Sequence, residues 1–232
     1  MRGQTPLAAL DGVEGWLTDD QARRLHDAVA ALEPPGRIVE IGSFRGRSTI
    51  ALASAAPEGV EVIAIDPHAG TDRGPQEVET DAATGESDHE RFLANLERAG
   101  VRDRVHHVRS FSQDALAEVD GDIDVLYVDG AHRYRPARDD LARWGARVRP
   151  GGTMLVHDSF SSIGVTAAIL RHLVWSREFA YVGRTASLAE YRRARPGPGS
   201  ALRQLAQLPW FARNLLVKVA LVLRLRSGDW PY

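Results

Sequence analysis

The chain of 232 residues is 44% hydrophobic and 26% charged, a composition that suits one α/β domain with a sizeable core. It lacks cysteine, which excludes disulfides and thiol catalysis, and it lacks both an apolar run of about 18 residues and the apolar core of a signal peptide, so we expect a cytoplasmic protein. The net charge of −2 is uneven, because residues 192–232 hold eight basic and one acidic residue, a charge of +7, while the remainder holds 21 basic and 30 acidic residues, a charge of −9.

The N-terminal part of the chain contains one predicted helix. Thr18 and Gln21 form a capping-box pattern, and the helix should continue to about Leu32, because two prolines follow. Its apolar residues recur on one face, so the helix should cover an edge of a sheet. We therefore predict an N-terminal helical extension over residues 1–35.

A strand, a glycine turn and a helix follow the extension. Residues 38–41 are apolar apart from Glu40, as in a strand that is buried on both faces. Gly42 ends this strand, Gly46 follows four residues later, and a helix is predicted from Ser48. Such a turn presents backbone N–H groups and a helix N-terminus at the carboxyl end of a parallel strand, which is where α/β sheets bind ligands.

The pattern Glu-x-Gly-x-x-x-Gly-x-Ser resembles the first motif of the class I S-adenosylmethionine (SAM)-dependent methyltransferases. In that family the glycine turn packs against the amino-acid end of SAM, and the acid takes part in the network around its ammonium group. The resemblance thus implies SAM as cofactor, held here by Glu40, Gly42, Ser43, Gly46 and Ser48. Two alternatives remain open: a tight turn without a ligand, and a dinucleotide-binding turn, which the missing third glycine and the acid disfavour.

A second strand is predicted over residues 60–65, and it ends at Asp66. An acid at this place, about 20 residues after the glycine turn, is typical of a ligand for ribose hydroxyls; the alternative is an acid that caps an ordinary turn. The polar stretch 67–87 that follows has little periodicity. It is predicted either as a lid on the substrate side or as a flexible insertion.

A helix is predicted over residues 88–99 and a third strand over residues 104–109. Two adjacent histidines in this strand point to opposite faces, which is a poor arrangement for binding one metal ion, so we interpret them as structural. Ser110, Phe111 and Ser112 follow the strand and should border the adenine of the cofactor.

Two acids follow neighbouring strands of the predicted sheet: Asp129 after residues 123–128 and Asp158 after residues 153–156. Both carboxylates should border the same crevice as the glycine turn and, with waters or substrate oxygens, they suit Mg²⁺. His132 is the predicted general base, because an unperturbed imidazole has a pKa of about 6.5. The alternative is that His132 is an ordinary loop residue that makes surface hydrogen bonds.

The sequence around these acids resembles the Asp-Gly-x-His-x-Tyr…Pro-Gly-Gly…His-Asp pattern of one family of class I methyltransferases, which includes macrolide-sugar and other natural-product O-methyltransferases. The match extends over residues 37–158. It implies SAM as methyl donor, Mg²⁺ held by Asp129 and Asp158, and catalysis by His132 as base together with Asp129. Metal-dependent relatives often carry a further Asp or Asn beside the fifth-strand acid, whereas this chain has histidine and serine there, so the third protein ligand stays open.

The last predicted elements are a helix over residues 165–175 and a hairpin of strands over residues 179–184 and 188–192. They complete an α/β fold with a Rossmann-like, seven-stranded mixed sheet of the class I methyltransferase type, which we assign to residues 36–194. Residues 195–232 are predicted as a linker and a basic amphipathic helix. This tail is too short and too charged to span a bilayer; it could lie on an anionic membrane, pair with a second subunit or dock on the acidic body.

We therefore predict a SAM-dependent O-methyltransferase, assisted by Mg²⁺, that methylates a hydroxyl of a sugar or a sugar-containing small molecule; the sugar is implied by the resemblance alone. The alternatives are a nucleotide-binding oxidoreductase of the Rossmann type and a non-catalytic module that docks a membrane or a partner protein. We expect a homo-oligomer with no nucleic-acid partner, and contact of the tail with the inner face of the membrane is left open.

Overall fold

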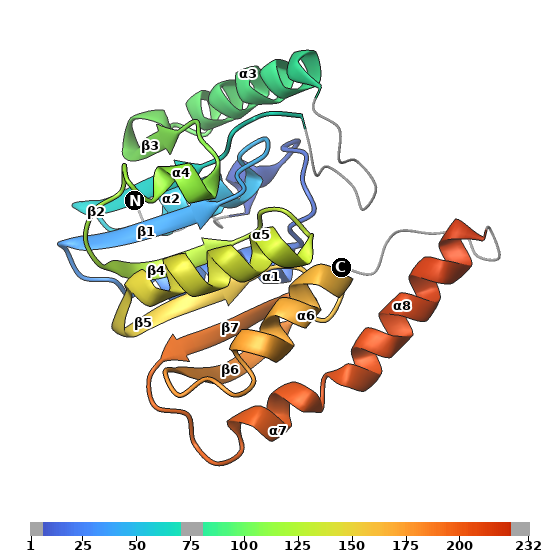
Figure 1. Cartoon of the computed structure of the whole chain (residues 1–232). Helices are drawn as coiled ribbons and strands as arrows, with labels where there is room; N and C mark the ends of the chain where they lie inside the picture. Colours follow the sequence, from blue (N-terminus) through green and yellow to red (C-terminus); the bar gives the residue numbers. More distant parts are fainter. Residues whose placement is uncertain (1–6, 71–80, 224–232) are drawn as a thin grey trace.

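The computed structural model describes residues 7–70 and 81–223, and these residues form one seven-stranded sheet (Figure 1). The strands lie in the order β3-β2-β1-β4-β5-β7-β6. Strands β1 to β5 pair in parallel, whereas β7 is antiparallel to both of its neighbours, so the predicted Rossmann-like, mixed α/β sheet is confirmed. The strand bounds are β1 Gly36–Ile41, β2 Val60–Ile65, β3 Val105–Val108, β4 Ile123–Val128, β5 Val148–Val156, β6 Phe179–Thr185 and β7 Leu188–Arg193.

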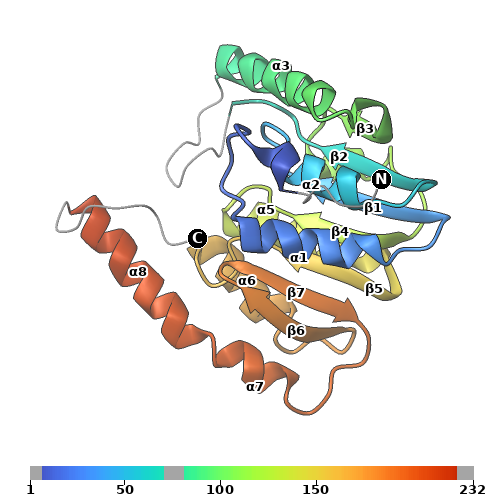
Figure 2. The same cartoon turned by 180° about the vertical axis from the view of Figure 1, so that it is seen from behind.

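Helices cover both faces of the sheet. Helices α4, α5 and α6 lie in front of the sheet in Figure 1, and Figure 2 shows α1 and α2 on the opposite face. The helix bounds are α1 Asp19–Ala30, α2 Arg47–Ala55, α3 Ala82–Arg98, α4 Ser112–Ala115, α5 Tyr134–Asp139, α6 Ile163–His172, α7 Ser200–Leu205 and α8 Leu208–Val222. Short 3₁₀ or π-helical turns are η1 Ala8–Leu10, η2 Arg102–Arg104, η3 Asp140–Trp144 and η4 Gly145–Arg147.

Side chains that alternate along each strand fill two hydrophobic cores. In β4, Leu126 and Val128 belong to the core beneath α5 and α6, whereas Val125 and Tyr127 belong to the core beneath α1 and α2. Parallel strands that are buried on both faces therefore carry nearly continuous apolar runs. Each fully buried large apolar side chain stabilises the fold by about 2 kcal/mol, so these cores hold the strand ends rigidly in place.

Strand β1 has β2 on one side and β4 on the other, so the chain adds its later strands on the opposite side of β1 from its earlier ones. The amide of Gly42 donates a hydrogen bond of 2.8 Å to the Ile65 carbonyl, and the amide of Asp129 donates one of 2.8 Å to the Ile41 carbonyl. The carboxyl ends of β1, β2 and β4 therefore meet at one place. In open α/β sheets, ligands bind outside the strand ends at such a switch point.

Several boundaries differ from the predictions. The capping box at Thr18 is present, and α1 ends at Ala30. The predicted polar loop is partly helical, because α3 begins at Ala82, where the Asp81 carboxylate accepts hydrogen bonds from the first amides. Residues 71–80 of the predicted lid lie outside the described residues. Strand β5 begins at residue 148 instead of the predicted residue 153, and its register against β4 shifts in this added part.

The tail contains two helices instead of the single predicted one. Helix α7 ends at Leu205 and α8 begins at Leu208. Residues 224–232 of the predicted tail lie outside the described part of the chain. In Figures 1 and 2, α8 runs away from α7 toward the edge of the sheet at which the parallel strands end. The division into three parts at residues 35 and 195 stays a prediction.

Candidate active site

The glycine turn brings the ends of β1 and β4 into close contact. Gly42 has a φ of +87°, and a Cβ atom added there would lie 2.1 Å from the Asp129 carbonyl oxygen. No side chain fits in that space, so only glycine allows this approach. Gly46 also has a φ of +87° and forms the N-cap of α2. The two glycines thus place the start of α2 beside the end of β4.

Asp66 holds the glycine turn from the neighbouring strand. Its Oδ2 atom accepts hydrogen bonds from the amides of Ser43 (2.9 Å) and Phe44 (2.8 Å). Its Oδ1 atom accepts a hydrogen bond of 2.7 Å from the amide of His68. A carboxylate has about four lone-pair positions, so one remains for a ligand. We refer to residues 42–48 together with Asp66 as the turn side of the site.

Glu40 lies beneath the turn and is completely buried. Its carboxylate accepts a hydrogen bond from the Thr49 hydroxyl. Burial raises the pKa of Glu40 to about 7, although the hydroxyls of Ser48 and Thr49 partly offset this effect. The side chain is absent from the cavity wall, so the geometry favours support of the turn over direct contact with a ligand.

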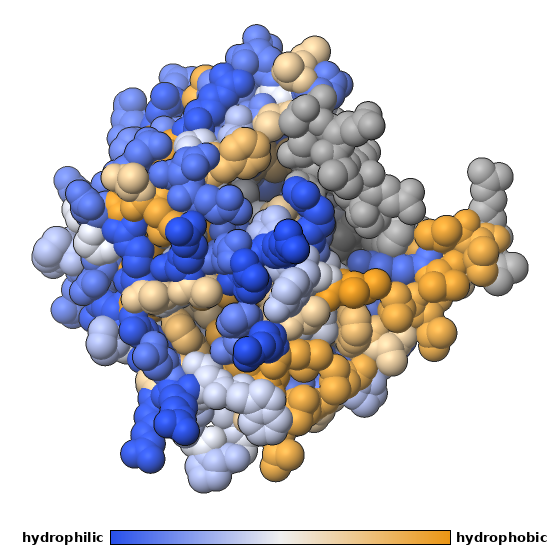
Figure 3. Space-filling model, viewed as in Figure 1, coloured by the Kyte–Doolittle hydropathy of each residue, from blue (hydrophilic) through white to orange (hydrophobic). Residues whose placement is uncertain are grey.

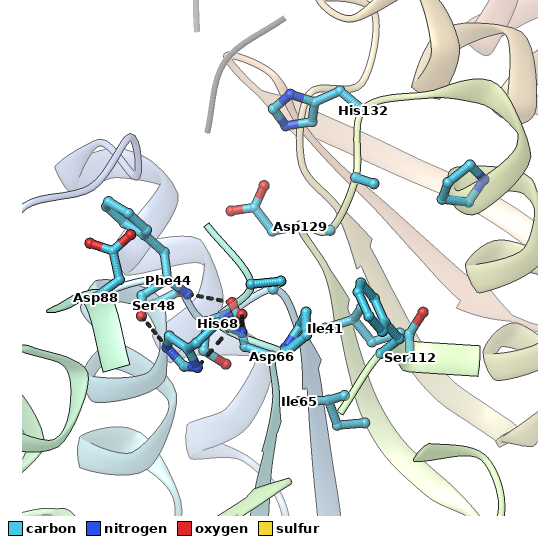
Figure 4. A pocket seen from close by; sticks show the side chains of 18 of the residues that line it. Ile41, Phe44, Ser48, Ile65, Asp66, His68, Asp88, Ser112, Asp129 and His132 are labelled. Carbon is cyan, nitrogen blue, oxygen red and sulfur yellow. Dashed lines mark hydrogen bonds and ion pairs between the residues drawn. The ribbon is translucent and has the colours of Figure 1, made fainter. Parts of the chain in front are cut away.

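A cavity of about 490 Å³ opens at the carboxyl ends of β1, β2 and β4, a size that suits a small-molecule ligand. Figure 4 shows Phe44, Asp66 and Asp129 around this cavity, with His132 beyond Asp129. The predicted site residues in its wall are Gly42, Ser43, Ser48, Asp66, Phe111, Ser112, Asp129 and His132. The predicted site residues outside the wall are Glu40, Gly46, Ser110 and Asp158.

The N-terminal extension supplies part of the wall that the sequence did not predict. Residues 14–17 line the cavity, and the Trp16 ring packs against Phe44 with 5.0 Å between ring centroids. Asp88 of α3 also lines it, and its carboxylate accepts a hydrogen bond of 2.8 Å from the buried Arg45 side chain. A tryptophan in an irregular segment is the signal that could have pointed to a binding role for this stretch.

The acids predicted at the strand ends lie beside two histidines. His132 Nε2 lies 2.7 Å from Asp158 Oδ2, and His157 Nδ1 lies 3.1 Å from Asp129 Oδ1 and 3.4 Å from Asp158 Oδ2. The Tyr127 hydroxyl donates a hydrogen bond of 2.8 Å to Asp129 Oδ2. We call Asp129, His132, His157 and Asp158 the acid–histidine cluster. No role is predicted for Tyr127 from the sequence, although strand periodicity puts it on the same side as Asp129.

Opposite charges stabilise one another inside this cluster. Burial lowers the pKa of His132, but the nearby Asp158 carboxylate outweighs burial, and the net pKa is raised. The pKa of His157 is raised in the same way, because Asp129 and Asp158 outweigh its burial. Burial raises the pKa of Asp158, but the two imidazoles hold it well below its ordinary value. The cluster therefore favours an ionised Asp158 carboxylate beside the two imidazoles.

The cluster also offers a donor set for a divalent cation. Among the described residues, Asp129, His132 and Asp158 each offer one ligand atom, and these atoms all lie within 4.8 Å of one another. Carboxylate oxygens suit Mg²⁺ and Mn²⁺, so Asp129 and Asp158 fit such an ion. The third protein ligand that the motif left open stays open, because Nε2 of His132 already pairs with Asp158.

A tight turn positions Asp158. Asp158 and Phe160 have φ values of +54° and +57°, a conformation that is rare outside glycine. Helix α8 contacts the same turn: Asn214 Nδ2 donates to the Phe160 carbonyl at 3.2 Å, and Lys218 Nζ donates to the Ser161 carbonyl at 3.0 Å. The tail thus satisfies two carbonyl groups in the turn that carries Asp158.

Comparisons with known proteins agree with this geometry. A family model described as a methyltransferase domain matches residues 39–159, just over half of the chain. Similar solved structures include a putative O-methyltransferase from Klebsiella pneumoniae (17% identity, TM-score 0.61, covering 84% of this chain and 92% of that one). The O-methyltransferase TomG from Streptomyces achromogenes, in complex with SAM, is 19% identical (TM-score 0.57, 84% and 92% covered). An O-methyltransferase from Bacillus cereus, in complex with SAH, is 19% identical (TM-score 0.57, 81% and 86% covered).

The chain belongs to this methyltransferase family, and its fold is that of the class I SAM-dependent methyltransferases. The family match contains the glycine turn and the whole acid–histidine cluster. A curated relative, the uncharacterized protein y4gI of Sinorhizobium fredii, is 28% identical over 129 residues, which are 54% of this chain and 13% of the relative. This chain thus spans a small part of that relative's length.

Proposed function

We propose that this protein is a SAM-dependent O-methyltransferase that methylates a hydroxyl group of a sugar or of a sugar-bearing small molecule with the help of Mg²⁺. The observation that carries the proposal is that Asp129 and His132 line the same cavity as the glycine turn. The similar structures of O-methyltransferases in complex with SAM or SAH support the donor and the type of reaction. The sugar rests on the resemblance of the sequence motif.

The turn side would bind the cofactor mainly through backbone groups. Gly42, Ser43 and Ser48 would contact its amino-acid end, and Asp66 would accept hydrogen bonds from its ribose hydroxyls. Phe111 and Ser112 would border the adenine. Nearby, the Asp140 carboxylate accepts a hydrogen bond of 2.5 Å from the Ser112 hydroxyl, and burial raises the pKa of Asp140 to about 6.

His132 would remove the proton of the acceptor hydroxyl. Because Nε2 of His132 pairs with Asp158, Nδ1 is the nitrogen that can take this proton. The Asp158 carboxylate then stabilises the imidazolium that forms, as the acid does in other acid–histidine pairs. The acceptor oxygen attacks the methyl carbon, the oxygen–carbon bond forms as the carbon–sulfur bond of SAM breaks, and neutral S-adenosylhomocysteine leaves.

The other members of the cluster hold this arrangement in place. Tyr127 and His157 both contact Asp129, so the Asp129 carboxylate has a fixed orientation at the cavity wall. Mg²⁺, which the Asp129 and Asp158 carboxylates would hold, supplies positive charge that lowers the pKa of an acceptor hydroxyl. Correct placement of the acceptor oxygen is itself a large part of the rate enhancement in such displacements.

Labelled methyl transfer tests the proposal. The purified chain is incubated with methyl-labelled SAM and a panel of glycosides, with extracts as a second acceptor source, in the presence of Mg²⁺ or EDTA. We expect label in a hydroxyl-bearing product, with turnover reduced by EDTA and restored by excess Mg²⁺. Turnover that EDTA leaves unchanged would remove the metal from the proposal, and label in a nitrogen or carbon position would remove O-methylation. The cytoplasmic location and the homo-oligomer stay predictions.

A further inference from the structure

Helix α8 has one face against the body of the protein. Asn214 is completely buried and hydrogen-bonds the turn that carries Asp158, and Lys218 bonds the next carbonyl of this turn. At the start of the helix, the Arg184 guanidinium lies over the Trp210 ring, with 3.8 Å between the guanidinium carbon and the ring centroid. The helix is therefore held to the body at the turn that carries Asp158 and at Arg184.

The opposite face of α8 is apolar and exposed. Leu216, Val219, Val222 and Leu223 are 71%, 47%, 62% and 61% exposed, and we call these four residues the apolar stripe. Their spacing of three and four residues puts them on one side of the helix. Figure 3 shows an apolar region, drawn in orange at the right, over α8. An exposed apolar patch of this kind marks a surface that contacts another molecule or a membrane.

The length of α8 favours a helix that lies on a membrane. In the described residues, Ser200–Val222 is the one segment that is long and apolar enough to cross a membrane by length and composition, with a mean hydropathy of 1.2. This segment is interrupted between α7 and α8, and the 15 residues of α8 extend about 22 Å, less than the roughly 30 Å of a bilayer core. Its other face is also already hydrogen-bonded to the body.

The charge of the tail favours an anionic lipid surface over a second copy of the chain. Residues 194–228 contain six basic residues and no acidic residue. Arg213 is exposed and flanks the stripe on one side by helical spacing. Two such tails facing each other would bring like charges together, whereas anionic headgroups attract basic residues near the surface.

We propose that the apolar stripe of α8 docks this protein on the surface of a bilayer that contains anionic lipids. The stripe enters the boundary between headgroups and acyl chains, and exposed basic residues such as Arg213 contact the headgroups. Because the same helix bonds the turn that carries Asp158, the docked protein holds the acceptor end of its cavity near the lipid surface. The placement of an acceptor site near the lipid rests on the proposed function, whereas the docking of α8 on lipid does not.

Vesicle flotation of the full-length chain tests the proposal. We expect the protein to float with vesicles of phosphatidylcholine and phosphatidylglycerol, to float far less with phosphatidylcholine alone, and to be released by high salt. The variant Leu216→Ser/Val219→Ser/Val222→Ser should reduce flotation by about tenfold or more, because three apolar side chains no longer enter the lipid. The matched control Trp175→Ser/Val182→Ser removes two other exposed apolar side chains, 72% and 45% exposed, and should float as the wild type does.

Two further measurements separate the outcomes. A stripe variant with the melting temperature and the S-adenosylhomocysteine affinity of the wild type is folded. The flotation result does not depend on methyl transfer, so it stands even if the methyltransferase proposal fails. Equal flotation of the wild type and the stripe variant overturns the docking proposal. It is also overturned if the wild type does not float and sedimentation shows a dimer that the stripe variant converts to monomers.

Discussion

The two sides of the cavity are held together by different forces. On the turn side, Asp66 accepts three backbone hydrogen bonds, and Gly42 allows one backbone to approach another. In the acid–histidine cluster, the contacts are between charged side chains from β4, β5 and the segments that follow them. Cofactor binding should therefore depend on backbone shape, whereas catalysis should depend on the protonation and placement of a few side chains.

The strongest test of this difference is Gly42→Ala. A Cβ atom 2.1 Å from the Asp129 carbonyl must displace either β1 or β4, and the φ of +87° is unfavourable for alanine. We expect a loss of about 3 kcal/mol or more in unfolding free energy and loss of measurable binding of S-adenosylhomocysteine. Denaturant unfolding and calorimetric titration measure the two effects.

The control for this variant is Gly151→Ala. Gly151 has a similar φ of +79°, but nothing lies within 4 Å of the added Cβ atom. It should therefore show only the backbone strain of about 1 kcal/mol and bind the cofactor normally. Equal effects at the two glycines would mean that the close approach of β1 and β4 does not matter.

The next largest effect is expected for His132→Ala. Loss of the general base should lower kcat by about 10² to 10⁴ while the affinity for S-adenosylhomocysteine changes little. The control is His26→Ala, which removes a histidine of similar exposure that also lies beside an aspartate. The His26 side chain is 31% exposed and the His132 side chain is 33% exposed. A parallel loss of affinity and turnover would contradict the separation of the two sides.

A smaller effect is expected for Glu40→Gln, which tests the support beneath the turn. The pKa of Glu40 is about 7 in the fold and 4.5 in the unfolded chain, so the native state binds this proton more tightly. Stability from this group therefore falls as the pH rises from about 4.5 through 7, by about 3 kcal/mol in total. The variant should be more stable than the wild type at pH 8 and similar at pH 4.5.

Melting temperatures across this pH range check the prediction, with Glu61→Gln on the neighbouring strand as the control. The Glu61 side chain is 43% exposed, so its substitution should leave the pH dependence unchanged. Parallel stability curves of the wild type and the Glu40→Gln variant would show that the pKa of Glu40 is the same in the folded and the unfolded chain.

Local patterns in the sequence predict the turn side well, because strand, glycine and strand-end acid follow one another within short distances. The positions of Asp129 and Asp158 at one edge also follow from the parallel topology. The close approach of His157 to both acids does not follow, because it depends on the unusual backbone of the turn at Asp158. The cavity contact of Trp16 depends on tertiary packing of a segment that has no regular structure.

The most direct test of the whole account is calorimetric titration of the wild-type chain with S-adenosylhomocysteine and, separately, with NAD. We expect the chain to bind one S-adenosylhomocysteine and no NAD. The variant Asp66→Ala should bind S-adenosylhomocysteine about tenfold more weakly, because Asp66 holds the turn and would also bind the ribose. Binding of NAD without binding of S-adenosylhomocysteine would contradict it and favour the oxidoreductase alternative. Binding of neither ligand would leave the cavity without its proposed cofactor.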